Sequence, residues 1–531
     1  MMLTMTMKKK ATFVPALLFL SSLVLDSASA NSWPVARFKN GTVGLQNEGA
    51  TVLINAQELQ VVGDVVAKGR NLIPPKCMSP GGDRLQYNGT DWLCVCAESW
   101  AGETCETQLP GASPLAAGVH HVCAILDDKS VKCWGWNKYG QLGLGDTDDR
   151  GDASGEMGDN LPTVDLGTGR TAIAISTGNS FSCAILDDKS VKCWGYNGFG
   201  RLGQGDLNNR GDASGEMGDN LLAIDLGTGR TAIAITTGGA HGCAILDDKS
   251  VKCWGWNNNG QLGLGDTDDR GDASGEMGDN LPTVDLGTGR TAIAISADDA
   301  HTCALLDNKS VKCWGYNFRG QLGLGDRDNR GDASGEMGDN LPTVDLGTGR
   351  TAIAIASGGL HTCALLDNLS VKCWGYNNRG QLGLGDTNQR GDASDEMGDN
   401  LPAVDLGTGR TAIAISASGY HTCALLDNKS VKCWGTNFNG RLGQGDTNHR
   451  GDASGEMGDN LPTVDLGTGR TATSIIAGNG HSCAVLDNKS VKCWGYNGDG
   501  RLGLGDTDDR GDASGEMGDN LPAVDLGETS V

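Results

Sequence analysis

Short apolar runs alternate with polar, glycine-rich stretches along most of the chain. One such series comprises Ala172–Ser176, Ser182–Leu186, Val191–Gly195 and Ala223–Leu226. The first run is small and apolar throughout, which predicts an inner strand packed on both faces, and the last run is expected to be the outer strand. No segment between the turns has the spacing of an amphipathic helix. The pattern therefore predicts four antiparallel strands in each series.

The series is one copy of an internal repeat. A motif that begins Cys-Ala-Ile-Leu-Asp, with small variations, recurs every 60 residues from Cys123 to Cys483, and seven near-identical copies fill residues 113–527. Four short antiparallel strands repeated seven times predict an all-β, seven-bladed β-propeller. An open solenoid is the alternative, but it requires distinct capping repeats, and the terminal copies here look ordinary.

Two motifs of the repeat resemble those of a known family. The first reads Trp134-Gly135-x-Asn137-x-x-Gly140-Gln141-Leu142-Gly143-x-Gly145-Asp146 and the second His301-Thr302-Cys303-Ala304-Leu305. They are similar to motifs of the regulator-of-chromosome-condensation repeat family, and this resemblance implies a seven-bladed propeller. It also implies two contrasting roles. Nuclear members are guanine-nucleotide exchange factors, whereas a secreted bacterial inhibitor of β-lactamases, similar in fold, serves as a protein-binding surface.

The N-terminus predicts secretion. Lys8, Lys9 and Lys10 precede an apolar run, and Ala28-Ser29-Ala30 offers small residues for cleavage before Asn31. We therefore expect residues 1–30 to be a signal peptide, with an uncleaved anchor as the alternative, and we expect no transmembrane segment elsewhere. Residues 31–75 are expected to form a short β-rich segment or stalk.

Secretion favours disulfides for the cysteines. In each repeat two cysteines ten residues apart would face each other across a hairpin whose loop holds three residues, a normal length. Two reduced, buried cysteines are the alternative. The predicted bridges are Cys123–Cys133, Cys183–Cys193, Cys243–Cys253, Cys303–Cys313, Cys363–Cys373, Cys423–Cys433 and Cys483–Cys493.

A second resemblance concerns the segment before the repeats. Cys94-Val-Cys96-Ala-Glu-Ser-Trp100-Ala-Gly102-Glu-Thr-Cys105 is similar to the C-terminal half of an epidermal-growth-factor (EGF) module. The resemblance implies a truncated, EGF-like module over residues 76–106, with bridges Cys96–Cys105 and Cys77–Cys94. Residues 107–112 would then be a linker and residues 528–531 a tail.

Differences between the repeats point to one face of the propeller. Most fall at residues 136–139, 147–149 and 177–181 or their counterparts, which the alternation of strand connections places on the face opposite the hairpin turns. Neutral drift in exposed loops and diversification of a binding surface both explain this. Aromatic side chains in these loops favour binding, because aromatic residues suit interface anchors. They are Trp136, Tyr139, Phe199, Trp256, Phe318 and Phe438.

Potential glycosylation sites lie on the other face or near the N-terminus. Four Asn-x-Ser sequons occupy hairpin turns, so glycans there would leave the variable loops clear. The six candidate sites are Asn40, Asn88, Asn308, Asn368, Asn428 and Asn488.

The chain is strongly acidic. Its formal net charge is −24, and it becomes −26 once residues 1–30 are removed, while the seven loops that correspond to Gly145–Asn160 together carry −28. This charge argues against binding to nucleic acid and would attract a basic partner or calcium. Alternatively, the acids make turns and pair locally with Arg150. No copy has the spacing of a calcium-binding loop. The candidate residues of the first loop are Asp148, Asp149, Asp152, Glu156 and Asp159.

Nothing in the sequence predicts catalysis. Histidines from His121 to His481 recur at one position per repeat, with Phe181 in the exceptional copy, and such a ring is expected to brace the blades. No serine or cysteine nucleophile is paired with a base, so we expect no enzyme and no cofactor other than a possible calcium ion. The sequence thus predicts a secreted or cell-surface scaffold that binds a protein. The alternatives are a carbohydrate- or calcium-dependent binding module and, third, an exchange factor of the nuclear type.

Overall fold

The computed structural model describes residues 113–528 and 530–531, together with the backbone of short strands between residues 37 and 108. The chain divides into two compact units. One comprises Met1–Ala97 with Glu103–Glu106, and the other Glu98–Gly102 with Thr107–Val531. Most of the predicted leader, stalk, EGF-like module and linker lies outside the described residues, including Cys77, Cys105 and the side chains of Cys94 and Cys96. The strands there are β1 (Arg37–Lys39), β2 (Thr42–Asn47), β3 (Ala50–Asn55), β4 (Val66–Ala67), β5 (Arg70–Asn71), β6 (Gly82–Tyr87), β7 (Trp92–Cys96), β8 (Trp100–Ala101) and β9 (Thr107–Gln108).

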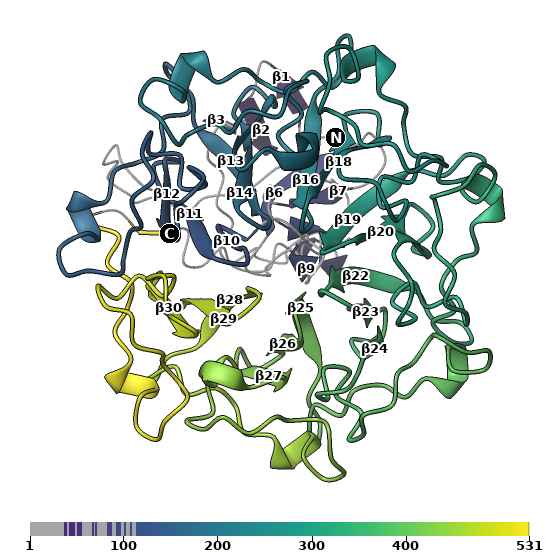
Figure 1. Cartoon of the computed structure of the whole chain (residues 1–531). Helices are drawn as coiled ribbons and strands as arrows, with labels where there is room; N and C mark the ends of the chain where they lie inside the picture. The colour runs from purple at the N-terminus through teal and green to yellow at the C-terminus, as the bar shows by residue number, and fades with distance from the viewer. Residues whose placement is uncertain are drawn as a thin grey trace. The chain divides into compact units, whose positions relative to one another are not determined.

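Seven three-stranded antiparallel sheets follow, one per repeat, and Figure 1 shows them arranged in a ring with the first strand of each sheet toward the centre. This arrangement confirms the predicted all-β, seven-bladed propeller. The sheets are β10–β12 (Leu115–Ala117, His121–Ile125, Val131–Gly135), β13–β15 (Ala172–Thr177, Phe181–Leu186, Val191–Gly195), β16–β18 (Ala232–Thr237, His241–Leu246, Val251–Gly255), β19–β21 (Ala292–Asp298, His301–Leu306, Val311–Gly315), β22–β24 (Ala352–Ser357, His361–Leu366, Val371–Gly375), β25–β27 (Ala412–Ser418, His421–Leu426, Val431–Gly435) and β28–β30 (Ala472–Ala477, His481–Leu486, Val491–Gly495).

The fourth strand of the prediction does not form. In the second repeat the segment at residues 223–226 makes one ladder bond, from Ile224 N–H to Val191 O at 2.8 Å. At the other end of β15, Gly195 pairs instead with Arg210 in an isolated bridge. The carbonyl of Leu166, the counterpart of Leu226 one repeat earlier, accepts a hydrogen bond from the buried Lys192 Nζ at 3.0 Å rather than from a strand. The outer edge of each sheet is therefore covered by separate short contacts rather than by a continuous fourth strand.

The inner strand also departs from the expected packing. Between Ala172 and Ala174 the register shifts, so that Ile173 is the extra residue of a β-bulge. A bulge turns its residue out of the regular alternation, and the Ile173 side chain is 41% exposed rather than packed on both faces.

The hydrophobic core lies between the sheets rather than within them. The first of seven clusters joins Cys123, Val131 and Leu142 of one repeat to Ala184 and Trp194 of the next. The cluster that closes the ring joins the seventh repeat to the first in the same way. Each sheet thus buries both faces against its neighbours, so a single repeat could not form a core alone.

Hydrogen bonds also connect each repeat to its neighbour. The indole Nε1 of Trp194 donates to the Gln141 carbonyl of the preceding repeat at 3.0 Å, and Trp134 makes the corresponding bond to Arg501 across the closure. The C-terminal tail assists the closure, because Asp127 N–H donates to Ser530 O at 2.8 Å.

A disulfide links the second and third strands of every sheet. Cys123 and Cys133 are directly opposed in the register, with their Cα atoms 4.1 Å apart. The hairpin between them has the expected three-residue loop, in which Lys129 takes a φ of 67°. The other pairs are Cys183–Cys193, Cys243–Cys253, Cys303–Cys313, Cys363–Cys373, Cys423–Cys433 and Cys483–Cys493.

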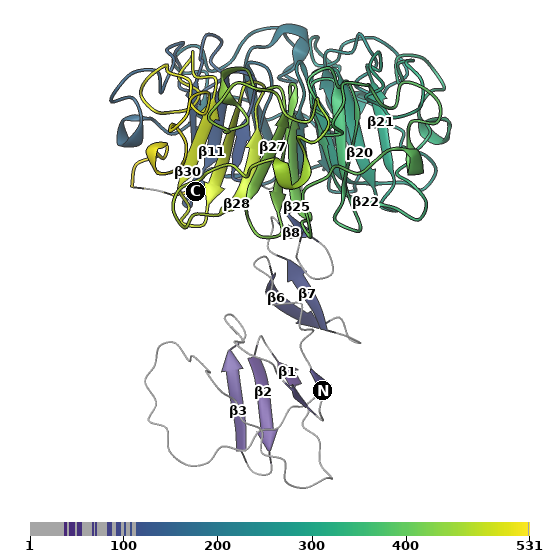
Figure 2. The ribbon, with the colours of Figure 1, turned by 90° about the horizontal axis from the view of Figure 1, so that it is seen from below.

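Short 3₁₀ turns interrupt the long connections between the sheets. Figure 2 shows connections at both ends of the propeller. Among the described residues no helix is long and apolar enough to cross a membrane. The 3₁₀ turns are η2 (Gly158–Asn160), η3 (Gly198–Gly200), η4 (Gly218–Asn220), η5 (Gly278–Asn280), η6 (Gly338–Asn340), η7 (Gly398–Asn400), η8 (Phe438–Gly440), η9 (Gly458–Asn460) and η10 (Gly518–Asn520).

Candidate functional site

Strand connections gather at the two ends of the propeller as the sequence predicts. In the second repeat, Tyr196 N–H donates to Ser180 O at 2.8 Å, which joins the connections at residues 178–180 and 196–210. At the other end Asp187 N–H donates to Thr171 O at 2.9 Å, which joins the hairpin turn to the link between repeats. We call the first end, with its counterparts in the other repeats, the loop face, and the second end the hairpin face.

Aromatic side chains form a broken ring on the loop face. Each lies directly after the third strand of its sheet, at the position of Trp136. The backbone there is fixed, because Gly135 pairs with Arg150 in an isolated bridge. Threonine replaces the aromatic residue in the sixth repeat. The seven residues are Trp136, Tyr196, Trp256, Tyr316, Tyr376, Thr436 and Tyr496.

The predicted aromatic anchors belong to this ring or stand beside it. Phe199, Phe318 and Phe438 are 45%, 51% and 50% exposed. Trp136, Tyr139 and Trp256 are half-buried. Ring contacts join some of these residues: Tyr139 lies edge-on to Trp136 at 5.5 Å between centroids, and Phe199 lies 5.9 Å from Trp256. The structure thus presents the six residues on one face, partly as contacting pairs.

Arginines stack on the aromatic rings, a feature that sequence reasoning missed. Arg201 lies 4.6 Å from the centroid of the Tyr196 ring, and burial lowers the pKa of its guanidinium to about 10. Arg319 covers both Tyr376, at 4.7 Å, and Phe318, at 5.2 Å. The signal was present, because Arg319 follows Phe318 directly and Arg201 lies two residues after Phe199.

The acidic loop of the first repeat uses half of its six carboxylates internally. Asp146 pairs with Arg150 at 2.6 Å, and Glu156 accepts hydrogen bonds from Gly151 N–H and Ala153 N–H at 2.9 and 3.1 Å. These contacts support the alternative in which the acids shape the loop.

Asp149 also takes part in the loop's structure. Its carboxylate accepts the Asn137 N–H at 2.7 Å. Burial raises the pKa of this carboxyl, and the nearby Asp152 adds to the effect. Among the predicted acids, only the carboxylates of Asp148 and Asp152 accept no hydrogen bond from the described residues.

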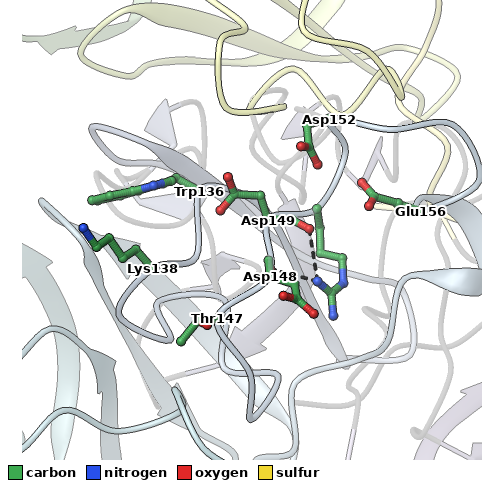
Figure 3. Close-up of a pocket in the computed structure, with 8 residues that line it drawn as sticks. Trp136, Lys138, Thr147, Asp148, Asp149, Asp152 and Glu156 are labelled. Carbon is green, nitrogen blue, oxygen red and sulfur yellow. Dashed lines mark hydrogen bonds between the residues drawn. The ribbon is translucent and has the colours of Figure 1, made fainter.

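Five of the predicted residues line one open groove of about 680 Å³ (Figure 3). Trp136 forms one wall, and Asp148, Asp149, Asp152 and Glu156 line the remainder. Lys138, Thr147 and Arg150, which were not predicted, complete it. The groove combines an aromatic wall with unpaired acceptors and one lysine, so it can receive a polar ligand that stacks on an indole ring.

The fifth predicted acid lies elsewhere. Asp159 lies near the end of the loop, and its carboxylate accepts a hydrogen bond from Glu528 N–H at 3.3 Å. Its counterpart Asp219 accepts both the N–H and the hydroxyl of Thr168 on the hairpin face, at 2.8 and 2.6 Å, and these bonds lower the pKa of the Asp219 carboxyl. The loop therefore runs from the loop face down the outer edge, and its charge is spread over both ends rather than gathered on one.

The histidine ring joins adjacent repeats. His301 Nε2 lies 2.9 Å from the Thr362 hydroxyl, which donates to the Gln321 carbonyl at 2.9 Å. Because that hydroxyl proton is used, the histidine must donate from Nε2. Burial lowers the pKa of His301 to about 4. These neutral, fully enclosed rings have a bracing role.

The hairpin face presents the four predicted sequons. Asn308, Asn368, Asn428 and Asn488 are exposed in their turns, where each side chain accepts a hydrogen bond from the serine two residues on. Asn40 and Asn88 lie outside the described residues. No group of three or more potential metal-ligating side chains occurs in the part of the chain that the structure describes.

Known proteins share this architecture. UVR8, the ultraviolet-B receptor of Arabidopsis thaliana, is 28% identical over 405 residues, which cover 75% of this chain and 79% of the receptor. The human E3 ubiquitin-protein ligase HERC2 is 26% identical over 335 residues, which are 63% of this chain but only 6% of the ligase.

Solved structures share the fold at lower identity. Yeast RCC1 (Prp20), solved bound to Kap60, superposes with a TM-score of 0.56 at 19% identity and covers 80% of this chain and 88% of its own. Human WBSCR16 superposes with a TM-score of 0.51 at 18% identity, and the match covers 70% of this chain and 87% of WBSCR16.

Two sequence models of one family match the repeats. One, described as regulator of chromosome condensation (RCC1) repeat, matches residues 115–141, 172–201, 232–261, 292–321, 352–381, 412–441 and 472–501. The other, with the same description, matches residues 130–185, 250–305, 310–365 and 371–425. Together they mark all seven repeats, and the chain belongs to the regulator of chromosome condensation (RCC1) repeat family.

Proposed function

We propose that this protein is an extracellular scaffold, without catalytic activity of its own, that binds a partner protein on the loop face. One observation carries the proposal: Phe199, Phe318 and Phe438, all about half exposed, stand on the face where the repeats differ most. Exposed aromatic residues are favourable interface anchors because they bury much apolar area with little loss of side-chain freedom.

The arginines beside these rings support the same role. Arg319 lies against Phe318 and Arg379 lies 5.5 Å from the Phe438 ring. Tryptophan, tyrosine and arginine dominate the binding energy of protein interfaces, and stacking orders the guanidinium before a partner arrives. A preordered side chain loses less entropy on binding, which favours affinity.

A protein of this fold gives a precedent for protein partners. Yeast RCC1 (Prp20) has been solved with Kap60 bound, and a second structure was described with its binding to Gsp1p and histones. Those partners belong to the yeast protein. The formal charge of −24 makes a basic partner favourable here as well, through long-range attraction.

An extracellular location accounts for the cysteines. A disulfide in every sheet of the propeller is typical of an oxidising compartment, and the sequence before Asn31 has the pattern of a cleaved leader. The proposal predicts that the protein recovered from culture medium begins at Asn31, which N-terminal sequencing would test.

A carbohydrate ligand is the second candidate. The groove beside Trp136 favours it, because a half-buried indole next to Asp148 and Asp152 offers a stacking surface and hydrogen-bond acceptors in one place. Replacement of Trp136 by alanine would abolish retention on a glycan array if sugars bind there, and would leave protein capture through Phe318 intact.

The test of the main proposal is affinity capture from the native extracellular medium with the full chain. We expect the triple variant F199A/F318A/F438A to lose captured proteins that the wild type retains. The matched control is L369A, which removes an exposed apolar side chain from a hairpin turn on the opposite face. Equal capture by wild type and triple variant would overturn the proposal. Loss of capture in the presence of a chelator would point instead to cation-dependent binding.

A further inference from the structure

The first strands of the seven sheets enclose a central cavity of about 220 Å³. Its lining consists mainly of alanine, glycine, serine, threonine and isoleucine side chains. Among the described residues that line it, Asp298 is the only charged one. Asp298 ends strand β19 and precedes the connection to β20, so it lies at the end of the cavity that opens on the loop face.

Asp298 is an exception to the repeat. Five of the seven repeats have glycine at this position, and a Cβ atom on one of them, Gly238, would lie 2.2 Å from the His241 ring. The fourth repeat admits a side chain because its inner strand is one residue longer and Asp299 takes a φ of 31°. The sixth repeat, with Ser418 at this position, is lengthened in the same way.

The two exceptional repeats are joined across the cavity mouth. Gly419 N–H donates to Asp298 Oδ2 at 3.2 Å, and Asp299 N–H donates to Oδ1 at 2.7 Å. The intervening repeat has only Gly358 and Gly359 here, so no side chain separates the partners. These bonds hold the carboxylate in place and leave part of it open to the cavity.

The Asp298 carboxylate has no cationic partner in the described part of the chain. Neither Asp298 nor Asp299 forms an ion pair there. Burial, with Asp299 as the second cause, raises the pKa of Asp298 to about 7. Part of its surface still faces the cavity, so an incoming cation could reach it. A half-buried carboxylate without a counter-ion is unfavourable, and a cation would relieve this.

A second polar residue in the cavity lining has an enclosed, unsatisfied hydroxyl. Thr177 lines the cavity, its side chain is more than nine-tenths buried, and its hydroxyl has no hydrogen-bond partner among the described residues. Its counterpart Thr237 is satisfied, because it lies 2.8 Å from the Ser176 hydroxyl. The cavity lining therefore includes one enclosed, unsatisfied hydroxyl as well as one carboxylate without a counter-ion.

An aromatic residue follows Gly419, the hydrogen-bond partner of Asp298. Tyr420 follows Gly419 directly, is 38% exposed, and lies 6.2 Å from the Tyr376 ring. Aromatic faces attract cations, and the attraction is greater where water is partly excluded.

We propose that this cavity receives a single lysine or arginine side chain of the partner, with Asp298 as its counter-ion. The volume suits one long side chain and falls below the roughly 300 Å³ at which pockets for whole small ligands begin. The inference rests on the proposed function, since the partner must dock on the loop face for its side chain to enter.

Saturation-transfer NMR on the full chain tests the site with defined probes. The probes are acetyl-Gly-Lys-Gly-amide and its twin with an acetylated lysine, each at about 5 mM, which populates a site of millimolar affinity. We expect transfer to the lysine methylenes of the first probe only. D298N and D298G should abolish it, whereas D128N, which removes an exposed carboxylate from a hairpin turn on the hairpin face, should leave it unchanged.

Other results would overturn the proposal. Equal transfer in D298N, transfer to the acetylated probe, or no transfer in the wild type would each do so. Thermal stabilisation by calcium chloride alone, lost in D298N, would assign the site to a free ion instead. Because five repeats already have glycine at this position, D298G should melt no lower than the wild type, so loss of transfer would not reflect unfolding.

The outcomes separate this site from the proposed function. If the F199A/F318A/F438A variant loses its captured proteins but D298N binds the lysine probe normally, the loop face stands and the cavity site falls. If the triple variant captures the same proteins as the wild type, the proposed function itself falls.

Discussion

His361 Nε2 lies 2.9 Å from Thr422 Oγ1, across the boundary between the fifth and sixth repeats. The Thr422 hydroxyl donates onward to the Gln381 carbonyl at 3.0 Å, so the chain of hydrogen bonds ties three elements together. The same arrangement recurs at most boundaries, and its exceptions are informative. Phe181 replaces the histidine at one boundary, and there the next repeat has Gly242 in place of the hydroxyl residue.

The paired exception predicts energetic coupling between the two positions. H361F leaves the Thr422 hydroxyl without its donor and inserts a larger ring, so we expect a loss of about 2 kcal/mol. H361F/T422G reproduces the natural Phe181–Gly242 pair, and we expect it to recover about 1 kcal/mol of that loss. Denaturant unfolding of the two single variants and the double variant measures this coupling. Strictly additive effects would show that the natural pairing is incidental.

The buried histidines predict loss of stability in mild acid. Burial lowers the pKa of His361 to about 3, against about 6.5 when the chain is unfolded. The unfolded state therefore binds more protons between these values, and stability falls as the pH falls below about 6.5. Each such histidine contributes a slope of up to about 1.4 kcal/mol per pH unit.

Melting temperatures between pH 7 and pH 4 test the assignment. The H361F/T422G variant has one fewer buried histidine, so its stability should fall less steeply than that of the wild type. If both proteins lose stability at the same rate, acid sensitivity arises from other groups.

Removal of a buried lysine is expected to lower the stability of the fold more than removal of a surface ion pair. Lys312 Nζ donates to the Leu286 and Gly338 carbonyls at 3.1 and 2.7 Å, which links adjacent repeats. K312M leaves both carbonyls unsatisfied, and we expect a loss of about 2–3 kcal/mol. The exposed Arg290–Asp307 pair is the control, because R290A should cost less than about 1 kcal/mol. Comparable losses in the two variants would contradict a structural role for Lys312.

Repetition made much of the fold predictable. The period fixed the number of sheets, and opposed positions such as Cys303 and Cys313 gave the hairpin register, since every copy carries the same signal. The predicted fourth strand was wrong although residues 223–226 alternate like a strand. Gly195 at the sheet edge pairs with Arg210, and the Leu226 carbonyl accepts a hydrogen bond from Lys252 Nζ. Such competition between partners depends on three-dimensional contacts that periodicity does not record.

The candidate site was predictable only in part. Variability between copies located the loop face and Phe318, because exposed loops are where repeats diverge. It did not separate Asp148 from Asp159, since neighbours in one loop can lie at opposite ends of a blade. Asp298 was missed for a different reason: a single acid among many is inconspicuous until the strands bring it to a cavity lined by small residues.

Asp298 itself predicts a pH dependence opposite to that of the histidines. Its pKa is about 7 in the folded protein, whereas an unfolded aspartate titrates near 3.8. The folded state keeps this proton longer, so ionisation of Asp298 makes folding less favourable as the pH rises from about 4 to about 7, with no further change above that. D298N removes the ionisation. Its melting temperature relative to the wild type should therefore rise across this range and then level off. D148N, which alters an exposed loop carboxylate, should show no such trend. A difference between D298N and wild type that is constant with pH would mean that the Asp298 carboxyl is not enclosed by the cavity mouth.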